Sequence, residues 1–165
     1  MLFRSMTMTL KYIDEVVPVL ADLQDKFNLS FMVIADKEPR LDLKDWRFVP
    51  WNALTEQEDL LKLDIGIMPL TVDPWSEGKC GFKLIQYFAC GIPGIANPVG
   101  VNKVIIEEGV NGFLCSSPAE WKSSLEKLLT DQQLRERMGM AGRKKMEEQY
   151  SMRSQANKFI GLFGD

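Results

Sequence analysis

The fold of this chain is decided by residues 75–97, whose sequence is WSEGKCGFKLIQYFACGIPGIAN. A polar, glycine-containing segment at 76–81 runs into an apolar-patterned segment that ends at Gly91, and a second apolar run follows at 93–97. This order predicts a loop, a short helix over 82–90, a turn and a strand. The first turn of such a helix presents unpaired N–H groups and the positive end of the helix dipole, which together favour an anion such as a phosphate.

The helix expected over 82–90 has two faces. Its polar face carries Lys83, Gln86, Tyr87 and Cys90 at the i, i+3, i+4, i+7 spacing, so we expect Lys83 to lie toward the preceding loop. A solvated helix surface explains the same pattern, and the loop lacks the GxxxxGK[ST] arrangement of a Walker phosphate-binding loop. The face that we expect to pack inward consists of Phe82, Leu84, Ile85, Phe88 and Ala89.

The composition is that of one ordinary globular domain. The chain has 165 residues, of which 45% are hydrophobic and 26% charged, and its formal net charge is −3. This charge and the lack of a concentrated basic block argue against nucleic acid as a partner. No run approaches the roughly 18 apolar residues of a membrane span, and the N-terminus lacks the apolar core of a signal peptide. We therefore expect a cytoplasmic protein without a membrane span.

The chain contains no histidine and three cysteines. The absence of histidine excludes a Ser-His-Asp triad, a Cys-His dyad and a histidine-based zinc hydrolase. The odd number and wide spacing of Cys80, Cys90 and Cys115 indicate neither a disulfide framework nor a metal site, and we expect Cys80 and Cys90 to be packing residues. Any chemistry must therefore use carboxylates, lysines or the substrate itself.

Short apolar runs alternate with helical patterns along the chain. Strands are expected at 30–35, 46–49, 64–70, 94–96 and 110–114. This alternation predicts an α/β domain with a doubly wound, mostly parallel, Rossmann-like sheet, whose ligands bind at the loops after Leu70 and Asn97. Further helices are expected at 9–27 with Thr9 as its cap and a kink at Pro18, at 55–63 with a capping box of Thr55 and Glu58, at 102–108, at 118–129 with a capping box of Ser117 and Glu120, at 131–149 and at 151–163.

Six blocks of the sequence, taken together, resemble a known family. They are TLKY at 9–12, DIGIMPL at 64–70, KLIQYFACGIP at 83–93, NPVGVN at 97–102, GVNGFL at 109–114 and YS at 150–151. In this order and with these gaps, the chain resembles the C-terminal donor-binding domain of glycosyltransferases with the two-domain GT-B fold, most closely the retaining family 4 enzymes. The resemblance implies one nucleotide-sugar-binding domain over residues 1–165 with a helical C-terminus.

The resemblance also implies a substrate and a set of binding residues. The substrate would be a UDP-, GDP- or ADP-sugar, and its glycosyl group would pass to an acceptor hydroxyl with retention, without metal or cofactor, as in polysaccharide biosynthesis. In the family, the loop and the helix start hold the diphosphate, a basic residue neutralises it, and a carboxylate at the Gln86 position holds the ribose. For Trp51, a packing role fits the sequence as well as stacking near the base. By position, the resemblance implies that catalysis uses Glu77 and Lys83. It implies that the donor is bound by Gly78, Lys79, Gly81, Lys83, Gln86, Val99, Gly100, Val101 and Trp51.

The sequence departs from the family in its carboxylates and at its N-terminus. The family has two glutamates separated by seven residues; here Gln86 stands at the second position and Gly78 at the first, with Glu77 beside it. The residues before Thr9 are too few for the family's acceptor-binding domain, and we expect the first strand to be truncated or missing. We therefore expect the chain alone to transfer nothing.

Three interpretations follow from this incompleteness. The chain is a piece of a glycosyltransferase, a non-catalytic nucleotide-sugar-binding subunit that needs a partner chain, or a decayed interaction domain. In each case the apolar residues of the last helix are expected to be exposed or to be buried in a homodimer. These residues are Phe159, Ile160, Leu162 and Phe163.

Overall fold

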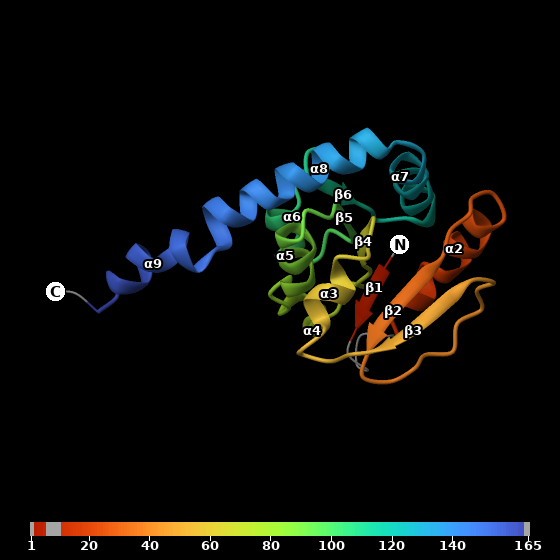
Figure 1. The fold of residues 1–165 in the computed structure, drawn as a ribbon, viewed down its shortest axis with the longest axis horizontal. Coiled ribbons are helices and arrows are strands. Elements are labelled where there is room, and N and C mark those ends of the chain that lie inside the picture. The colour runs from red at the N-terminus through yellow and green to blue at the C-terminus, as the bar shows by residue number, and fades with distance from the viewer. Residues whose placement is uncertain (1, 6–10, 164–165) are drawn as a thin grey trace.

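The computed structural model describes residues 2–5 and 11–163, and its centre is one parallel sheet (Figure 1). In this described part, six strands are arranged in the order β3-β2-β1-β4-β5-β6, and each neighbouring pair is parallel. The strand order reverses between β1 and β4, which is the arrangement of a doubly wound Rossmann-like domain and confirms the predicted fold class. The strands are β1 (Leu2–Ser5), β2 (Phe31–Ala35), β3 (Trp46–Pro50), β4 (Gly66–Met68), β5 (Gly94–Ala96) and β6 (Gly112–Leu114).

The first strand, expected to be truncated or missing, is present as the four-residue β1. β1 lies in the middle of the sheet, where Leu2 is in register with Met32 of β2 on one side and with Gly66 of β4 on the other. Four residues suffice because a central strand forms a ladder of backbone hydrogen bonds on both edges. The predicted cap Thr9 lies outside the described residues.

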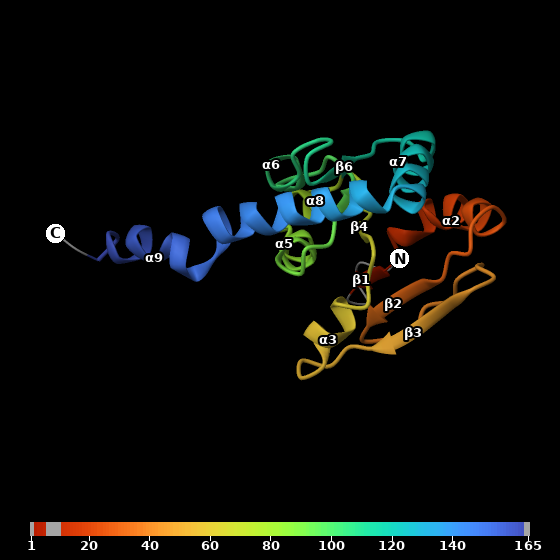
Figure 2. The same ribbon diagram turned by 45° about the horizontal axis from the view of Figure 1, so that its top comes forward.

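Helices cover both faces of the sheet and bury two separate clusters (Figures 1 and 2). Because side chains alternate along a strand, Val33 of β2 faces the cluster of α2 and α7, while Ile34 faces the cluster of α5 and α6. The helical elements are η1 (Ile13–Glu15), α2 (Val17–Gln24), α3 (Glu56–Leu60), α4 (Pro74–Glu77), α5 (Phe82–Ala89), α6 (Asn102–Ile105), α7 (Pro118–Thr130), α8 (Gln132–Lys145), η2 (Met146–Tyr150) and α9 (Met152–Ile160).

The predicted helix starts meet different outcomes. The capping box before α7 is confirmed, because the Ser117 hydroxyl accepts from the Glu120 N–H while the Glu120 carboxylate accepts from the Ser117 N–H. Thr55 forms no such box; its hydroxyl donates to the Asp59 carboxylate at 3.1 Å. Pro18 stands in the first turn of α2 and produces no kink, because the missing N–H of proline costs nothing there.

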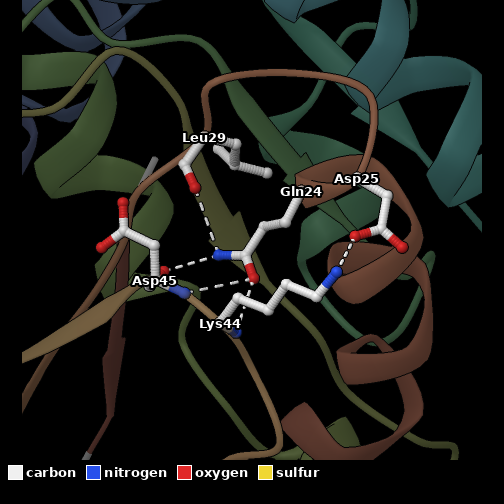
Figure 3. A network of polar contacts seen from close by, with 5 residues as sticks. All are labelled: Gln24, Asp25, Leu29, Lys44 and Asp45. Carbon is white, nitrogen blue, oxygen red and sulfur yellow. Dashed lines mark hydrogen bonds and ion pairs between the residues drawn. The ribbon is translucent and has the colours of Figure 1, made fainter.

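A side-chain amide ties the end of α2 to the chain that enters β3 (Figure 3). The Gln24 amide nitrogen donates to the carbonyl of Leu29 at 3.1 Å, and the Gln24 amide oxygen accepts from the N–H of Lys44 at 3.0 Å. An exposed ion pair between Lys44 and Asp25 supports the same contact. The network holds the segment before the edge strand β3 against the end of α2, and none of its residues belongs to the predicted ligand loops.

The C-terminal helices end outside the domain. α8 runs along the body, passes through the π-helical turn η2, and leads into α9, which projects away from the sheet in both views (Figures 1 and 2). None of the residues of α9 is buried within this chain, where Phe159 of α9 is 64% exposed and Phe163, just after the helix, is 77% exposed. Within the described residues, no helix is long and apolar enough to cross a membrane.

Candidate functional site

The carboxyl ends of β4, β5 and β6 are fixed by one asparagine. The Asn97 side chain accepts from the N–H of Leu70 at 2.8 Å and donates to the carbonyl of Cys115 at 2.9 Å. The Asn102 side chain in turn donates to the Asn97 carbonyl at 3.1 Å. The loops after β4 and β5, where the sequence predicts ligand binding, therefore start from a rigid edge.

A partly buried polar cluster lies beside this edge, at the start of α4. Asp73 caps α4 by accepting from the Ser76 N–H at 2.8 Å, and the Tyr12 hydroxyl donates to the same carboxylate at 2.6 Å. The Ser76 hydroxyl donates to the Tyr12 oxygen at 3.0 Å. These bonds, first the one from Tyr12 and then the one from the Ser76 N–H, lower the pKa of Asp73 to about 2. Asp73 is therefore an ionised acceptor at neutral pH.

Sequence reasoning missed both Tyr12 and Asp73 as site residues. Asp73 had a local signal, because an aspartate immediately before Pro74 is a typical start of a helix. No local sequence signal indicates the contact of Tyr12 with Asp73, since the two residues are 61 positions apart in the chain.

Lys79 places its ammonium group against this cluster. Its Nζ lies 4.7 Å from the centroid of the Tyr12 ring, is shielded from solvent, and has no hydrogen-bond partner among the described residues. Loss of hydration lowers the pKa of Lys79, while the nearby Asp73 carboxylate opposes this shift. Lys11 brings a second ammonium to 4.7 Å from the same ring centroid. The site thus holds a cation with unused donor capacity.

The segment that carries Lys79 packs against the loop after β5. Gly81 has φ +67°, and a Cβ there would lie 2.3 Å from Cδ1 of Ile105 and 3.0 Å from Cγ2 of Val101. Ser76 and Glu77, predicted to be loop residues, instead belong to α4, because the Asp73 cap starts a helical turn before Gly78. Cys80, predicted to be a packing residue, is exposed.

Gly100 is already engaged by a residue of this chain. The N–H of Gly100, a residue to which the family resemblance assigns donor binding, donates to Oε2 of Glu77 at 3.1 Å. The two backbones also touch, because a Cβ at Gly100, whose φ is +51°, would lie 2.8 Å from the carbonyl oxygen of Glu77. The structure therefore joins Glu77 and Gly100, both predicted site residues, to each other.

The inward face of α5 differs from the prediction at three positions. Tyr87 is fully buried, because Gly66 opposite has no side chain; a Cβ there would lie 2.3 Å from the Tyr87 ring. Phe82, the first residue of α5, is 55% exposed, and Ala89 is exposed as well. The helical spacing was read correctly for Leu84 and Phe88, which are buried, and for Ile85, which is partly buried and packs against the same cluster.

Two other predicted residues line or approach a groove beside α5. Gln86 is half-buried in an open groove of about 480 Å³ between α3, α5 and the end of α8, which Tyr150 also lines. Trp51, at the end of β3, is 44% exposed and donates from its ring N–H to Glu56 at 3.1 Å. Lys83 lies one turn before Gln86 and is half-buried. Among the described residues, no cluster of three or more cysteine or acidic side chains is arranged to hold a metal ion.

The comparisons with known proteins agree on one family. The family described as glycosyl transferases group 1 matches residues 8–145, which is most of the chain. The chain belongs to the glycosyl transferases group 1 family. It is 33% identical over 75 residues to D-inositol 3-phosphate glycosyltransferase of Thermobifida fusca (strain YX), an alignment that covers 44% of this chain and 17% of that protein.

Solved structures of glycosyltransferases share the GT-B domain fold of this chain. A mutant of TarM from S. aureus, in complex with fondaparinux, alpha-GlcNAc-glycerol and UDP, has a TM-score of 0.76 at 18% identity; the match covers 99% of this chain and 35% of TarM. The C-terminal domain of the group 1 protein LpcC from Francisella tularensis has a TM-score of 0.73 at 20% identity, and the match covers 92% and 86% of the two chains. This chain thus spans about a third of TarM but most of the isolated C-terminal domain of LpcC.

In this glycosyltransferase domain, the predicted site residues fall into two groups. Glu77, Gly78, Lys79 and Gly81 lie along the loop of Val99, Gly100 and Val101, as the contacts of Glu77 and Gly81 show. Gln86 lines the groove behind α5, and Trp51 lies at the end of the neighbouring strand β3. The shielded ammonium group of Lys79 suits an anionic ligand.

Proposed function

We propose that this domain binds the nucleoside-diphosphate sugar from which a glycosyltransferase moves the glycosyl group to an acceptor hydroxyl, with retention at the anomeric carbon. The observation that carries the proposal is the Nζ of Lys79, an ammonium group that is shielded from water and lacks a hydrogen-bond partner within the described part of the chain. Leaving a charged donor unsatisfied is costly, and a phosphate oxygen would satisfy it. The UDP complex of the structurally similar TarM mutant supports this assignment.

The residues divide the donor between them. Lys79 would hold the diphosphate, and its charge would stabilise the diphosphate as it leaves the sugar. Gln86 would hydrogen-bond the ribose hydroxyls, since an amide both donates and accepts, and Trp51 would lie beside the base. Lys83, one turn before Gln86, would add a second positive charge near the diphosphate.

The whole enzyme would need more protein than this domain. The relatives that the chain matches are longer, with this chain spanning 35% of TarM. We place the contact with the remaining part, or with a partner chain, on the exposed apolar stripe formed by Met152 and Phe159, which lie on one face of α9, and by Phe163 just after this helix. A homodimer through the same stripe is the alternative. Three unpaired thiols fit a reducing compartment such as the cytoplasm.

A non-catalytic donor-binding subunit is the second candidate function. It is favoured by Gly78 and Gln86, which stand where the family carries two glutamates. Such a subunit would bind the donor as tightly as proposed above. It would differ in supporting no transfer when it is joined to a complete acceptor-binding partner.

The test of donor binding is calorimetry of the chain with UDP, GDP, ADP and their sugars, comparing wild type with Lys79→Met. Methionine keeps most of the stem of the lysine and removes its charge. Loss of a charged hydrogen bond of about 1.5–3 kcal/mol predicts affinity weaker by roughly 10- to 150-fold. The matched control is Lys158→Met, which removes an equal charge from exposed α9.

A second measurement uses the exposed thiol beside Lys79. The alkylation rate of Cys80 should fall when a donor nucleotide is bound, while buried Cys115 stays unreacted in both states. Absence of binding by every nucleotide, or equal affinities of Lys79→Met and wild type, would contradict the proposal.

A further inference from the structure

The Glu77 carboxylate takes up a backbone N–H that the donor would need. Its Oε2 accepts from the Gly100 N–H at 3.1 Å, and the carbonyl oxygen of Glu77 also faces the Cα of Gly100 so closely that a Cβ would lie 2.8 Å from it. The end of α4 and the loop after β5 are therefore held together by a side-chain contact and a backbone contact. These two segments follow strands β4 and β5 at the proposed diphosphate site.

We propose that Glu77 sets the affinity of this site as a built-in competitor: its carboxylate occupies the Gly100 N–H, and a bound diphosphate displaces it. The proposal rests on the donor-binding function above. It gives Glu77 a role that differs from contact with the donor sugar, which the resemblance to the family suggests.

The competition follows from the chemistry of one N–H group. Carboxylate and phosphate oxygens are both anionic acceptors for backbone donors, and one well-aligned N–H serves only one of them. Glu77 is exposed, so its carboxylate regains water when it leaves Gly100. The net loss is then that of one exposed hydrogen bond, which is small enough for a diphosphate to overcome.

Lys79, two residues after Glu77, favours the binding of an anion, whereas Glu77 opposes it. The shielded Nζ of Lys79 has no hydrogen-bond partner among the described residues and attracts an anion, whereas Glu77 repels one. The short segment 77–81 thus carries an attracting and a competing charge. When the nucleoside diphosphate leaves after transfer, return of Glu77 to Gly100 closes the site again.

The two roles of Glu77 predict effects of opposite sign. If Glu77 competes with the diphosphate, its removal strengthens the binding of pyrophosphate and of nucleoside diphosphates and leaves a bare nucleoside unaffected. If Glu77 contacts the donor sugar, its removal weakens only the nucleotide sugar. Pyrophosphate is the most direct probe, because it carries neither base nor sugar.

The experiment measures the affinity of wild type, Glu77→Ala and Glu77→Gln for pyrophosphate, UDP and uridine by calorimetry. Loss of one competing hydrogen bond predicts that Glu77→Ala binds pyrophosphate and UDP about three- to tenfold more tightly, with Glu77→Gln in between. The matched control is Glu58→Gln, which removes the charge of another exposed glutamate, on α3. Melting curves establish that the variants are folded.

Hydrogen exchange of the Gly100 amide provides a readout without ligand. Exchange should be faster in Glu77→Ala than in wild type. Unchanged or weaker pyrophosphate affinity in Glu77→Ala, or binding in neither protein, would overturn the competitor role. A different result would contradict the donor-binding function alone. Wild type would then bind no nucleotide, while Glu77→Ala would still bind pyrophosphate more tightly than wild type.

Discussion

The proposed donor edge of the sheet, formed by the segments that follow β4 and β5, differs from helix α9 in how it is held in place. At the donor edge, Asn97, Asp73 and Gly100 each join segments that are far apart in the chain, and the loops touch through backbone atoms. α9 buries none of its residues and exposes a row of apolar side chains. The difference shows that contacts within the domain fix the segments at the ends of β4 and β5, whereas no such contacts cover the apolar side chains of α9 among the described residues.

The largest expected loss of stability comes from a substitution where α8 packs against the turn at Gly91. A Cβ at Gly139 of α8 would lie 1.9 Å from the carbonyl oxygen of Gly91, a backbone atom that cannot turn aside. We expect Gly139→Ala to lower the free energy of unfolding by about 3 kcal/mol, measured by urea titration.

The matched control is the same substitution after α9. At Gly161 a Cβ would lie 3.3 Å from the nearest atom, and we expect Gly161→Ala to change the stability by less than about 0.5 kcal/mol. Equal effects of the two substitutions would show that α8 does not pack on the turn at Gly91 as described.

An intermediate effect concerns the polar cluster at Asp73, and it depends on pH. The pKa of Asp73 is lowered from 3.8 to about 2, so the ionised carboxylate stabilises the folded chain above the unfolded value. This contribution is lost as the pH falls through about 4 toward about 2. We therefore expect Asp73→Asn to melt below wild type at neutral pH and the gap in melting temperature to close in acid.

The control for this pH dependence is Asp42→Asn, which changes an exposed aspartate outside the cluster. Its melting temperature should follow that of wild type throughout. A gap for Asp73→Asn that persists unchanged at pH 2 would mean that the Tyr12 and Ser76 bonds do not favour the ionised carboxylate.

The smallest expected effect tests α9. Phe159 and Phe163 contact each other edge to face, with ring centroids 5.2 Å apart, but both rings are mostly exposed. Replacing both by serine should change the free energy of unfolding by less than about 0.5 kcal/mol, measured by urea titration of dilute protein. A larger loss that grows with protein concentration would instead show that a second copy of the chain covers the stripe.

The short-range features of the fold could be read from the sequence. The runs at 30–35 and 94–96 became β2 and β5, and Ser117 with Glu120 formed the predicted capping box, because period and capping depend on residues within a few positions. The first strand was missed, since a four-residue segment becomes a strand only through the partners on its two sides. The orientation of Tyr87 was missed because the space for its ring comes from Gly66 on a neighbouring strand.

The candidate site, like the fold, has features that could be predicted from the sequence and features that could not. The sequence by itself determined the family, through short motifs, and the α/β order, through local apolar periods. Only the tertiary structure decided that Tyr12 binds Asp73, that Lys79 is shielded without a hydrogen-bond partner among the described residues, and that Glu77 occupies the Gly100 N–H. The physical reason is that hydrogen bonding and loss of hydration depend on which distant segments meet, and the loops after β4 and β5 meet only when the sheet has formed.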